Sequence, residues 1–135
     1  MPHDLAEALR WLAYAMEDLE HGKLGAPSFP RSAAWSFQQA AEKALKALIL
    51  VSGEPVPKVH DLAYLLQVLE RKFSHGGELL EAAMALSEIS TASRYPADMV
   101  EITVKDCAEF QQAAETVVTW CKFQLDHWPT NEAGG

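Results

Sequence analysis

The stretch that most constrains the fold is WSFQQAAEKALKALILV at residues 35–51. Apolar residues recur along it at steps of three and four, the spacing that places side chains on one face of a helix. That stripe consists of Phe37, Ala41, Ala44, Leu48 and Val51. Leu45, Ile49 and Leu50 are apolar outside the stripe, so we expect this helix to contact neighbours on more than one side.

An adjacent sector of the same helix is polar. It contains Gln38, Gln39, Glu42, Lys43 and Lys46. Glu42 and Lys46 stand at the i,i+4 spacing that stabilises helices through ion pairing. The simplest interpretation is therefore an exposed, ion-paired face, and the alternative is a functional surface on a central helix.

The same periodicity predicts helices on either side of this stretch. The first begins at Asp4 and ends near His21–Gly22, and its stripe consists of Leu5, Leu9, Leu12, Met16 and Leu19. A loop is expected over residues 22–30, and Pro30 suits the first turn of the central helix. A third helix starts at His60–Asp61 and carries Leu62, Leu65, Leu66, Leu69 and Phe73, and a shorter fourth helix spans about Glu78 to Ser90. Thr103 and Asp106 mark the start of a long last helix, whose stripe holds Phe110, Ala114, Val117, Cys121, Leu125 and Trp128.

These patterns predict an all-α fold. We expect an up-and-down helical bundle of four long helices plus one shorter helix. The bundle is expected to occupy residues 1–128 as one domain, and residues 129–135 to form a flexible C-terminal tail. Val100–Thr103 could pass for a short strand, but no other segment offers a convincing strand to pair with it.

Composition narrows the function classes. The net charge of −8 argues against broad attraction to nucleic acid, because phosphate binding depends on clustered Lys and Arg. No apolar run approaches the length of a membrane span, and the first residues do not resemble a signal peptide, so we expect a cytoplasmic protein without membrane contact. Cys107 and Cys121 lie 14 residues apart in one predicted helix, roughly 21 Å along its axis, so they cannot pair within it and are expected to be reduced and buried.

Few residues carry the spacing of a known chemical motif. The five histidines form none of the pairs that place two metal ligands on one helix face, and no phosphate-binding glycine loop is present, so we expect neither a metal nor another cofactor. Three polar clusters remain: Gln38–Lys46, His60–Asp61 and Arg94–Tyr95–Pro96. Each has a structural explanation when it is taken alone, such as a helix cap at Asp61.

Their order in the chain resembles a known family. QQAAEKALKALI at 38–49, HDLAYLL at 60–66 and SRYP at 93–96 are similar to motifs of the HEPN domain (higher eukaryotes and prokaryotes nucleotide-binding), over roughly residues 4–126. The resemblance implies an all-helical bundle that is commonly a homodimer. It also implies one of two roles: a metal-independent ribonuclease, or a small prokaryotic protein that is linked to nucleotide binding and works with a minimal nucleotidyltransferase.

The sequence departs from the ribonuclease group. That group carries Arg, then four to six residues, then His, whereas the positions after Arg94 where this His would stand hold Met99, Val100 and Glu101. RNA cleavage without a metal needs groups that take and return a proton. Arg94 can hold a phosphate but stays protonated, and His60 could replace the missing His only if the fold brings it close. Whether the protein is an enzyme is therefore left open.

Three hypotheses follow. The first is a nucleotide- or phosphate-binding module of a toxin–antitoxin-like pair, with a nucleotidyltransferase partner. Its expected ligand-binding residues are Gln39, Lys43, Lys46, His60, Asp61, Arg94 and Tyr95. The second is a ribonuclease with a non-standard site that uses Arg94 and His60. The third is a purely structural dimeric interaction protein, in which the same clusters hold the dimer together.

Overall fold

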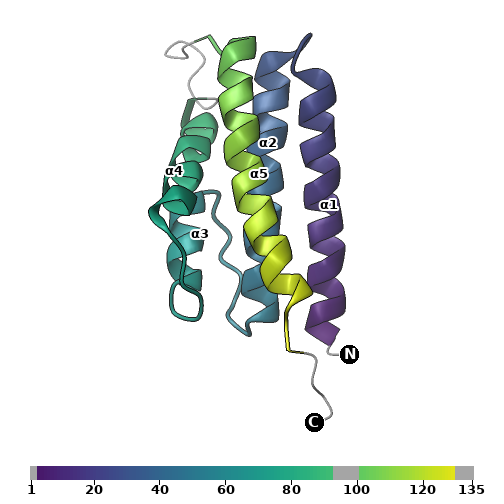
Figure 1. The fold of residues 1–135 in the computed structure, drawn as a ribbon, viewed down its shortest axis with the longest axis vertical. Coiled ribbons are helices and arrows are strands. Elements are labelled where there is room, and N and C mark those ends of the chain that lie inside the picture. The colour runs from purple at the N-terminus through teal and green to yellow at the C-terminus, as the bar shows by residue number, and fades with distance from the viewer. Residues whose placement is uncertain (1–2, 93–100, 130–135) are drawn as a thin grey trace.

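The structure is a computed structural model, and it describes residues 3–92 and 101–129. Arg94, Tyr95 and the tail from Thr130 onward lie outside the described residues. Within the described part the chain forms α1 (His3–Gly25), α2 (Pro30–Val51), α3 (Leu62–Leu69), α4 (Gly77–Ala92) and α5 (Val104–Asp126). These residues contain no strand, and the helices form an up-and-down bundle (Figure 1), so the expected fold class is confirmed.

The lengths of two helices differ from the sequence-based expectation. The short helix of the bundle is α3, with 8 residues, whereas α4 has 16. Phe73, which was expected on α3, lies beyond the end of that helix and packs against Trp120 and Trp128 instead. The described residues therefore form four long helices and one short one, and the short one is the third of them in the chain.

Helix α2 is the centre of the bundle, since it packs against α1, α3, α4 and α5. It begins at Pro30, where the missing N–H of proline costs nothing. Six alanines are among its buried residues, and such small side chains let neighbouring helices approach closely. They are Ala33, Ala34, Ala40, Ala41, Ala44 and Ala47.

Helix α1 buries most of the expected stripe, since Leu9 also packs partly buried against the core, and Met16 alone departs from it. Leu5, Leu12 and Leu19 are buried, but Ala8 and Ala15 complete the stripe, while Met16 is exposed. Gly22 continues this stripe at the point where α1 meets α2, and a Cβ added there would lie 2.4 Å from a ring atom of Phe37. The helix therefore extends past Gly22 to Gly25, and the loop that was expected over residues 22–30 shrinks to residues 26–29.

After α2 the chain turns back along that helix. The backbone carbonyl of His60 accepts a hydrogen bond of 3.3 Å from Gln38 Nε2, near the middle of α2. Helix α3 then returns toward the C-terminal end of α2, where Lys72 Nζ donates to the carbonyl of Ser52. Figure 1 shows this path, in which residues 52–61 rise beside α2 before α3 descends. The segment thus places His60 against the polar sector of α2.

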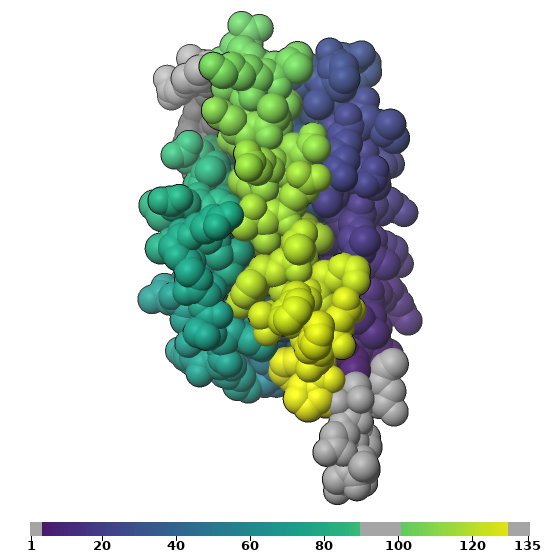
Figure 2. Space-filling view, in the orientation of Figure 1, coloured from purple at the N-terminus to yellow at the C-terminus, as the bar shows by residue number. Residues whose placement is uncertain are grey.

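Helix α5 closes the bundle and fills the face between α1 and α4 in the space-filling view (Figure 2). Thr103 and Asp106 form a capping box at its start, in which the Asp106 N–H donates to Thr103 Oγ1 and the Thr103 N–H donates to Asp106 Oδ2. Cys107 and Cys121 are buried and unpaired, as expected. Residues 101–103 are not a strand.

Candidate functional site

A network of polar side chains is buried on α2. Gln38 is fully buried and Glu42 is 5% exposed, although both belong to the sector expected to face solvent. The interpretation of an exposed face was therefore wrong for these two residues. Helix α2 is covered by residues 52–61 and by α3 on this side, and that covering could not be predicted from the spacing of polar residues within α2.

Glu42 joins the other members of the network. Its Oε1 accepts hydrogen bonds from Gln38 Nε2 at 3.2 Å and from His60 Nδ1 at 2.9 Å. Its Oε2 accepts from Lys46 Nζ at 3.1 Å. Both oxygens of the buried carboxylate are thus satisfied, as a buried charge requires.

Gln38 links this carboxylate to the preceding residues and to the returning chain. Its Nε2 donates to both Glu42 and the His60 carbonyl, and its Oε1 accepts a 2.7 Å hydrogen bond from Gln39 Nε2. Residues 38, 42 and 46 recur at i,i+4 steps, so one helix face supplies three members of the network. This spacing was the signal that could have identified Gln38 and Glu42, which were not among the expected ligand-binding residues.

The imidazole of His60 has a defined orientation. Nδ1 lies 2.9 and 3.1 Å from the two oxygens of Glu42. An ionised carboxylate only accepts hydrogen bonds, so Nδ1 carries the proton and a neutral ring presents its lone pair at Nε2. The His60 side chain is 58% exposed, and Nε2 has no protein partner among the described residues. The network therefore opens to solvent at a nitrogen able to accept or donate a proton or hydrogen-bond a ligand.

The charge of the network is nearly balanced. The Lys46 side chain is only 13% exposed, and its ammonium group is paired with Glu42. The cation is therefore neutralised locally, and net positive charge arises only when His60 is protonated. The described residues alone thus form a polar, weakly charged site and not a strongly cationic one.

Two of the expected ligand-binding residues make other contacts. Lys43 Nζ forms a 2.6 Å ion pair with Asp18 of α1. Asp61 is the N-cap of α3, where its Oδ1 accepts from the backbone N–H groups of Ala63 and Tyr64. The structure thus brings Gln39, Lys46 and His60 into one network and gives Lys43 and Asp61 structural contacts.

Arg94 and Tyr95 lie outside the described residues. The helix before them in the chain, α4, is placed relative to α3 by one hydrogen bond. The backbone N–H of Leu62 donates to Ser87 Oγ at 3.0 Å, so the start of α3 lies beside Ser87 of α4. Ala92, the last described residue of α4, is five residues further on, about 7.5 Å along the helix axis. Helix α4 therefore ends about 7.5 Å beyond the level of the α3 start.

Metal-binding clusters and membrane spans are both absent from residues 3–92 and 101–129. In these ranges no group of three or more His, Cys, Asp or Glu side chains gathers closely enough to hold a metal ion. No helix in the same ranges is both long enough and apolar enough to cross a membrane.

Comparison with known proteins identifies the fold. The family model that describes the HEPN domain matches residues 3–124. The solved structure of the protein TT1696 from Thermus thermophilus is similar with a TM-score of 0.79 at 27% identity, covering 87% of this chain and 97% of that one. No curated protein sequence matches the chain.

Two further solved structures are similar. ST0689, described as an archaeal HEPN homologue, gives a TM-score of 0.74 at 27% identity over 87% of this chain and 97% of its own. A HEPN domain protein of Thermotoga maritima, tm0613, gives 0.61 at 27% identity over 93% of this chain and 99% of its own. All of these similarities extend over most of the bundle.

Proposed function

This chain belongs to the HEPN domain family, and we propose from that premise that it is a nucleotide- or phosphate-binding module. The single observation that supports this most strongly is the Gln38–Glu42–Lys46–His60 network, which is buried at α2 and opens to solvent at His60. A buried polar network with one open nitrogen offers fixed hydrogen-bonding groups to a ligand without reorganisation.

In the proposed complex His60 Nε2 and the Gln39 carboxamide hydrogen-bond the ligand, and Lys46 holds the Glu42 carboxylate that orients His60. Because Glu42 neutralises Lys46, a phosphate needs a further cation. We assign this part to Arg94, which follows the end of α4 by two residues and can hold a phosphate with two parallel hydrogen bonds. Tyr95 is assigned to stacking on a base. Lys43 and Asp61 support the site through α1 and α3.

We further propose that the protein works as a homodimer with a nucleotidyltransferase-type partner, in a toxin–antitoxin-like pair. The family membership supports this assembly. Purification of the chain from its native cell, followed by mass spectrometry, is expected to recover a nucleotidyltransferase. Recovery of the chain without such a protein would contradict this part of the proposal.

The binding site is tested by nuclear magnetic resonance of the His60 imidazole during titration with ATP. We expect the His60 signals to shift, and Arg94→Ala to abolish the shift while helix content and thermal stability stay nearly unchanged. Arg31→Ala is the matched control, because Arg31 is exposed on α2 and makes no ion pair with the described residues.

Two outcomes would contradict the role in ligand binding that is proposed for Arg94. An unchanged ATP-induced shift in Arg94→Ala would remove this residue from the site. A large loss of folding in the same variant would instead favour the purely structural role, in which the clusters hold the dimer together.

A second candidate, a metal-independent ribonuclease, is favoured by the Glu42–His60 hydrogen bond. A carboxylate that fixes the tautomer of an exposed imidazole is an arrangement suited to general acid–base catalysis. In this reaction His60 Nε2 would take the proton of a ribose 2′-hydroxyl, whose oxygen attacks the adjacent phosphorus. The bond from phosphorus to the 5′-oxygen of the next nucleotide breaks, and that oxygen leaves as a hydroxyl after it takes a proton from water.

The two candidates differ in one assay. RNA incubated with the pure protein and a chelator is expected to survive if the protein only binds nucleotides. Cleavage that persists with the chelator and disappears in His60→Ala would replace binding with ribonuclease activity as the function.

A further inference from the structure

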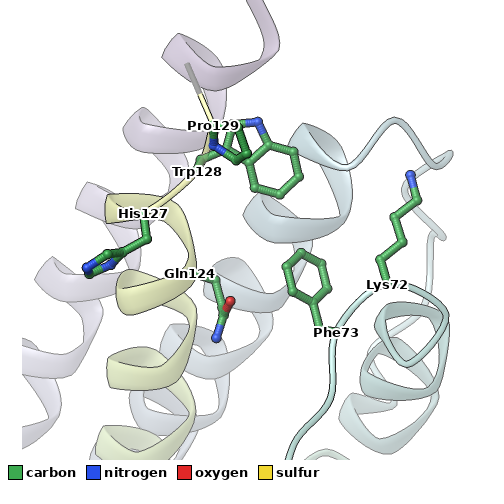
Figure 3. Close-up of a pocket in the computed structure, with 6 residues that line it drawn as sticks. All are labelled: Lys72, Phe73, Gln124, His127, Trp128 and Pro129. Atoms are coloured by element: carbon green, nitrogen blue, oxygen red, sulfur yellow. The ribbon is translucent and has the colours of Figure 1, made fainter. Parts of the chain in front are cut away.

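A cavity lies at the end of the bundle away from the start of α5. It has a volume of about 440 Å³ and is lined by Lys72, Phe73, Gln124, His127, Trp128 and Pro129. Figure 3 shows that these residues come from the segment after α3, from the last turn of α5 and from the residues that follow α5. The volume falls within the range of roughly 300–1,000 Å³ that is typical of small-molecule sites. We call this cavity the C-terminal cleft.

Aromatic side chains form one wall of the C-terminal cleft. The rings of Phe73 and Trp128 lie 6.1 Å apart between centroids and are tilted by 40°. Phe73 also contacts Trp120, with centroids 5.9 Å apart in an edge-on arrangement. The two lining rings thus contact each other directly, so a ligand ring would stack against this wall and not slide between its members.

One polar side chain of the C-terminal cleft, Gln124, is free to bind a ligand. Gln124 is half-buried, and its carboxamide has no hydrogen-bond partner among the described residues. It can therefore donate and accept a hydrogen bond at the edge of a planar ligand. His127 contributes less, because its ring stacks on Phe123 and points away from the Phe73–Trp128 wall (Figure 3).

The charge at the C-terminal cleft is positive. Lys72 donates to a backbone carbonyl and has no acidic partner among the described residues. No Asp or Glu lines the cleft. The acidic residues nearby in sequence are engaged elsewhere, since Glu70 contacts His75 and Asp126 contacts Lys122. In a chain of net charge −8, this cationic cleft stands out as a place for an anion.

We propose that the C-terminal cleft binds a planar aromatic ligand that carries a negative charge. The ring stacks on the Phe73–Trp128 wall, the Gln124 carboxamide hydrogen-bonds its edge, and the Lys72 ammonium group holds the anionic group. A nucleoside phosphate and an aromatic carboxylate share this chemistry. The proposal is independent of the α2 network, whose groups do not line this cleft.

The test follows the indole N–H signals of the four tryptophans by nuclear magnetic resonance during titration with four probes. Adenosine 5′-monophosphate and indole-3-acetate each combine a ring with a negative charge, whereas adenosine lacks the charge and inorganic phosphate lacks the ring. We expect the Trp128 signal, identified with Trp128→Phe, to shift with an aromatic anion while the Trp11 and Trp35 signals stay in place.

Side-chain variants then locate the contacts. Lys72→Gln is expected to weaken binding of the aromatic anion about fivefold, the effect of losing one partly exposed ion pair. Gln124→Leu removes the edge hydrogen bonds and is also expected to weaken binding. Lys105→Gln is the matched control: it removes one exposed lysine, unpaired among the described residues, at the opposite end of α5 and is expected to leave affinity unchanged.

The outcomes separate the two ligand sources. Binding of adenosine 5′-monophosphate alone identifies a nucleotide site, and binding of indole-3-acetate alone identifies an aromatic carboxylate site. No shift of the Trp128 signal with either aromatic anion, equal binding of inorganic phosphate, or equal weakening by Lys72→Gln and Lys105→Gln would overturn the proposal. The His60 signals report the α2 network separately, so failure of one site is distinguishable from failure of the other.

Discussion

At the scale of single residues, the Glu42 carboxylate is a charged group buried beside the core. It accepts hydrogen bonds from Gln38, Lys46 and His60 while being 5% exposed. Burying a carboxylate costs free energy even when it is fully hydrogen-bonded. Removing one member of the network costs more, because it leaves the remaining buried polar groups without a hydrogen-bond partner. The network is therefore expected to behave as a unit.

A substitution at Glu42 tests this. We expect Glu42→Ala to lower the free energy of unfolding by about 2–4 kcal/mol, since it leaves the Lys46 ammonium group and the Gln38 amide without their acceptor. Denaturant unfolding followed by circular dichroism measures the loss. Glu17→Ala, at an exposed position of α1 without an ion pair to the described residues, is the control and is expected to change stability by less than about 0.5 kcal/mol. Equal losses in both variants would show that the network contributes nothing specific.

The cysteines give a prediction about pH. Desolvation by burial raises the pKa of the Cys121 thiol, and burial is also the main cause of the raised pKa of Cys107. Their usual pKa is 9.0, so above that pH the unfolded chain releases protons that the folded chain keeps. The stability that depends on these thiols is therefore fully present below pH 9 and is lost as the pH rises above it, by about 1.4 kcal/mol for Cys121 at pH 10.

Unfolding curves between pH 8 and pH 10 measure this slope. Cys121→Ala removes one of the two thiols, so its stability is expected to fall less steeply with pH than that of the parent chain, whatever its absolute stability. Parallel curves for the two proteins would contradict the assignment.

At the scale of elements, the contact between α1 and α2 depends on the absence of a side chain at Gly22. A Cβ there would meet three ring atoms of the fully buried Phe37, the nearest at 2.4 Å. The ring is rigid and fully buried, so relief of this overlap requires the ring or the two helices to shift.

We expect Gly22→Ala to destabilise the protein by about 1–2 kcal/mol, because overpacking costs about 1–3 kcal/mol while the better helix propensity of alanine returns up to about 1 kcal/mol. Gly25→Ala is the matched control on the same helix: its Cβ would meet nothing within 4 Å, and its φ is not positive. Thermal unfolding of both variants checks this, and a stabilised Gly22→Ala would show that the helices adjust freely.

The elements also show how far the sequence alone could go. The number of helices, the Pro30 start of α2 and the capping box at Thr103 depend on local patterns, and they could be predicted. The end of α3 could not, because Phe73 continues the apolar spacing of that helix and only its packing on Trp120 and Trp128 shows that the helix has stopped. The stripe of α1 was right except at Met16: Ala8 and Ala15 are fully buried beside Leu5, Leu12 and Leu19, whereas Met16 is exposed.

The candidate site was predictable in part. The sequence pointed to Gln39, Lys46 and His60, which do meet in one network. It did not place Lys43, whose partner Asp18 lies 25 residues away on another helix. Nor did it indicate that Glu42 is buried, because burial depends on the path of residues 52–61 across α2 and not on the polar spacing within it.

At the scale of the whole molecule, the proposed homodimer can be tested by a measurement of mass in solution. Large apolar side chains are exposed on several helices, including Trp35 on α2, Tyr64 on α3 and Met84 on α4, and such surfaces are compatible with self-association. We expect sedimentation equilibrium to give twice the chain mass of 14.9 kDa. A single-chain mass at every concentration tested would contradict the dimer.

The hydrogen bond between His60 and Glu42 joins residues 18 positions apart and connects the segment 52–61 to α2. Two of the carboxylate's three donors come from its own helix and are in place whenever α2 is formed, whereas the imidazole arrives only when residues 52–61 have settled. The His60–Glu42 hydrogen bond therefore forms only when residues 52–61 lie against α2. Because the His60 imidazole is also exposed to solvent, its proton resonances can report the rate at which residues 52–61 leave and return to α2, without any added label.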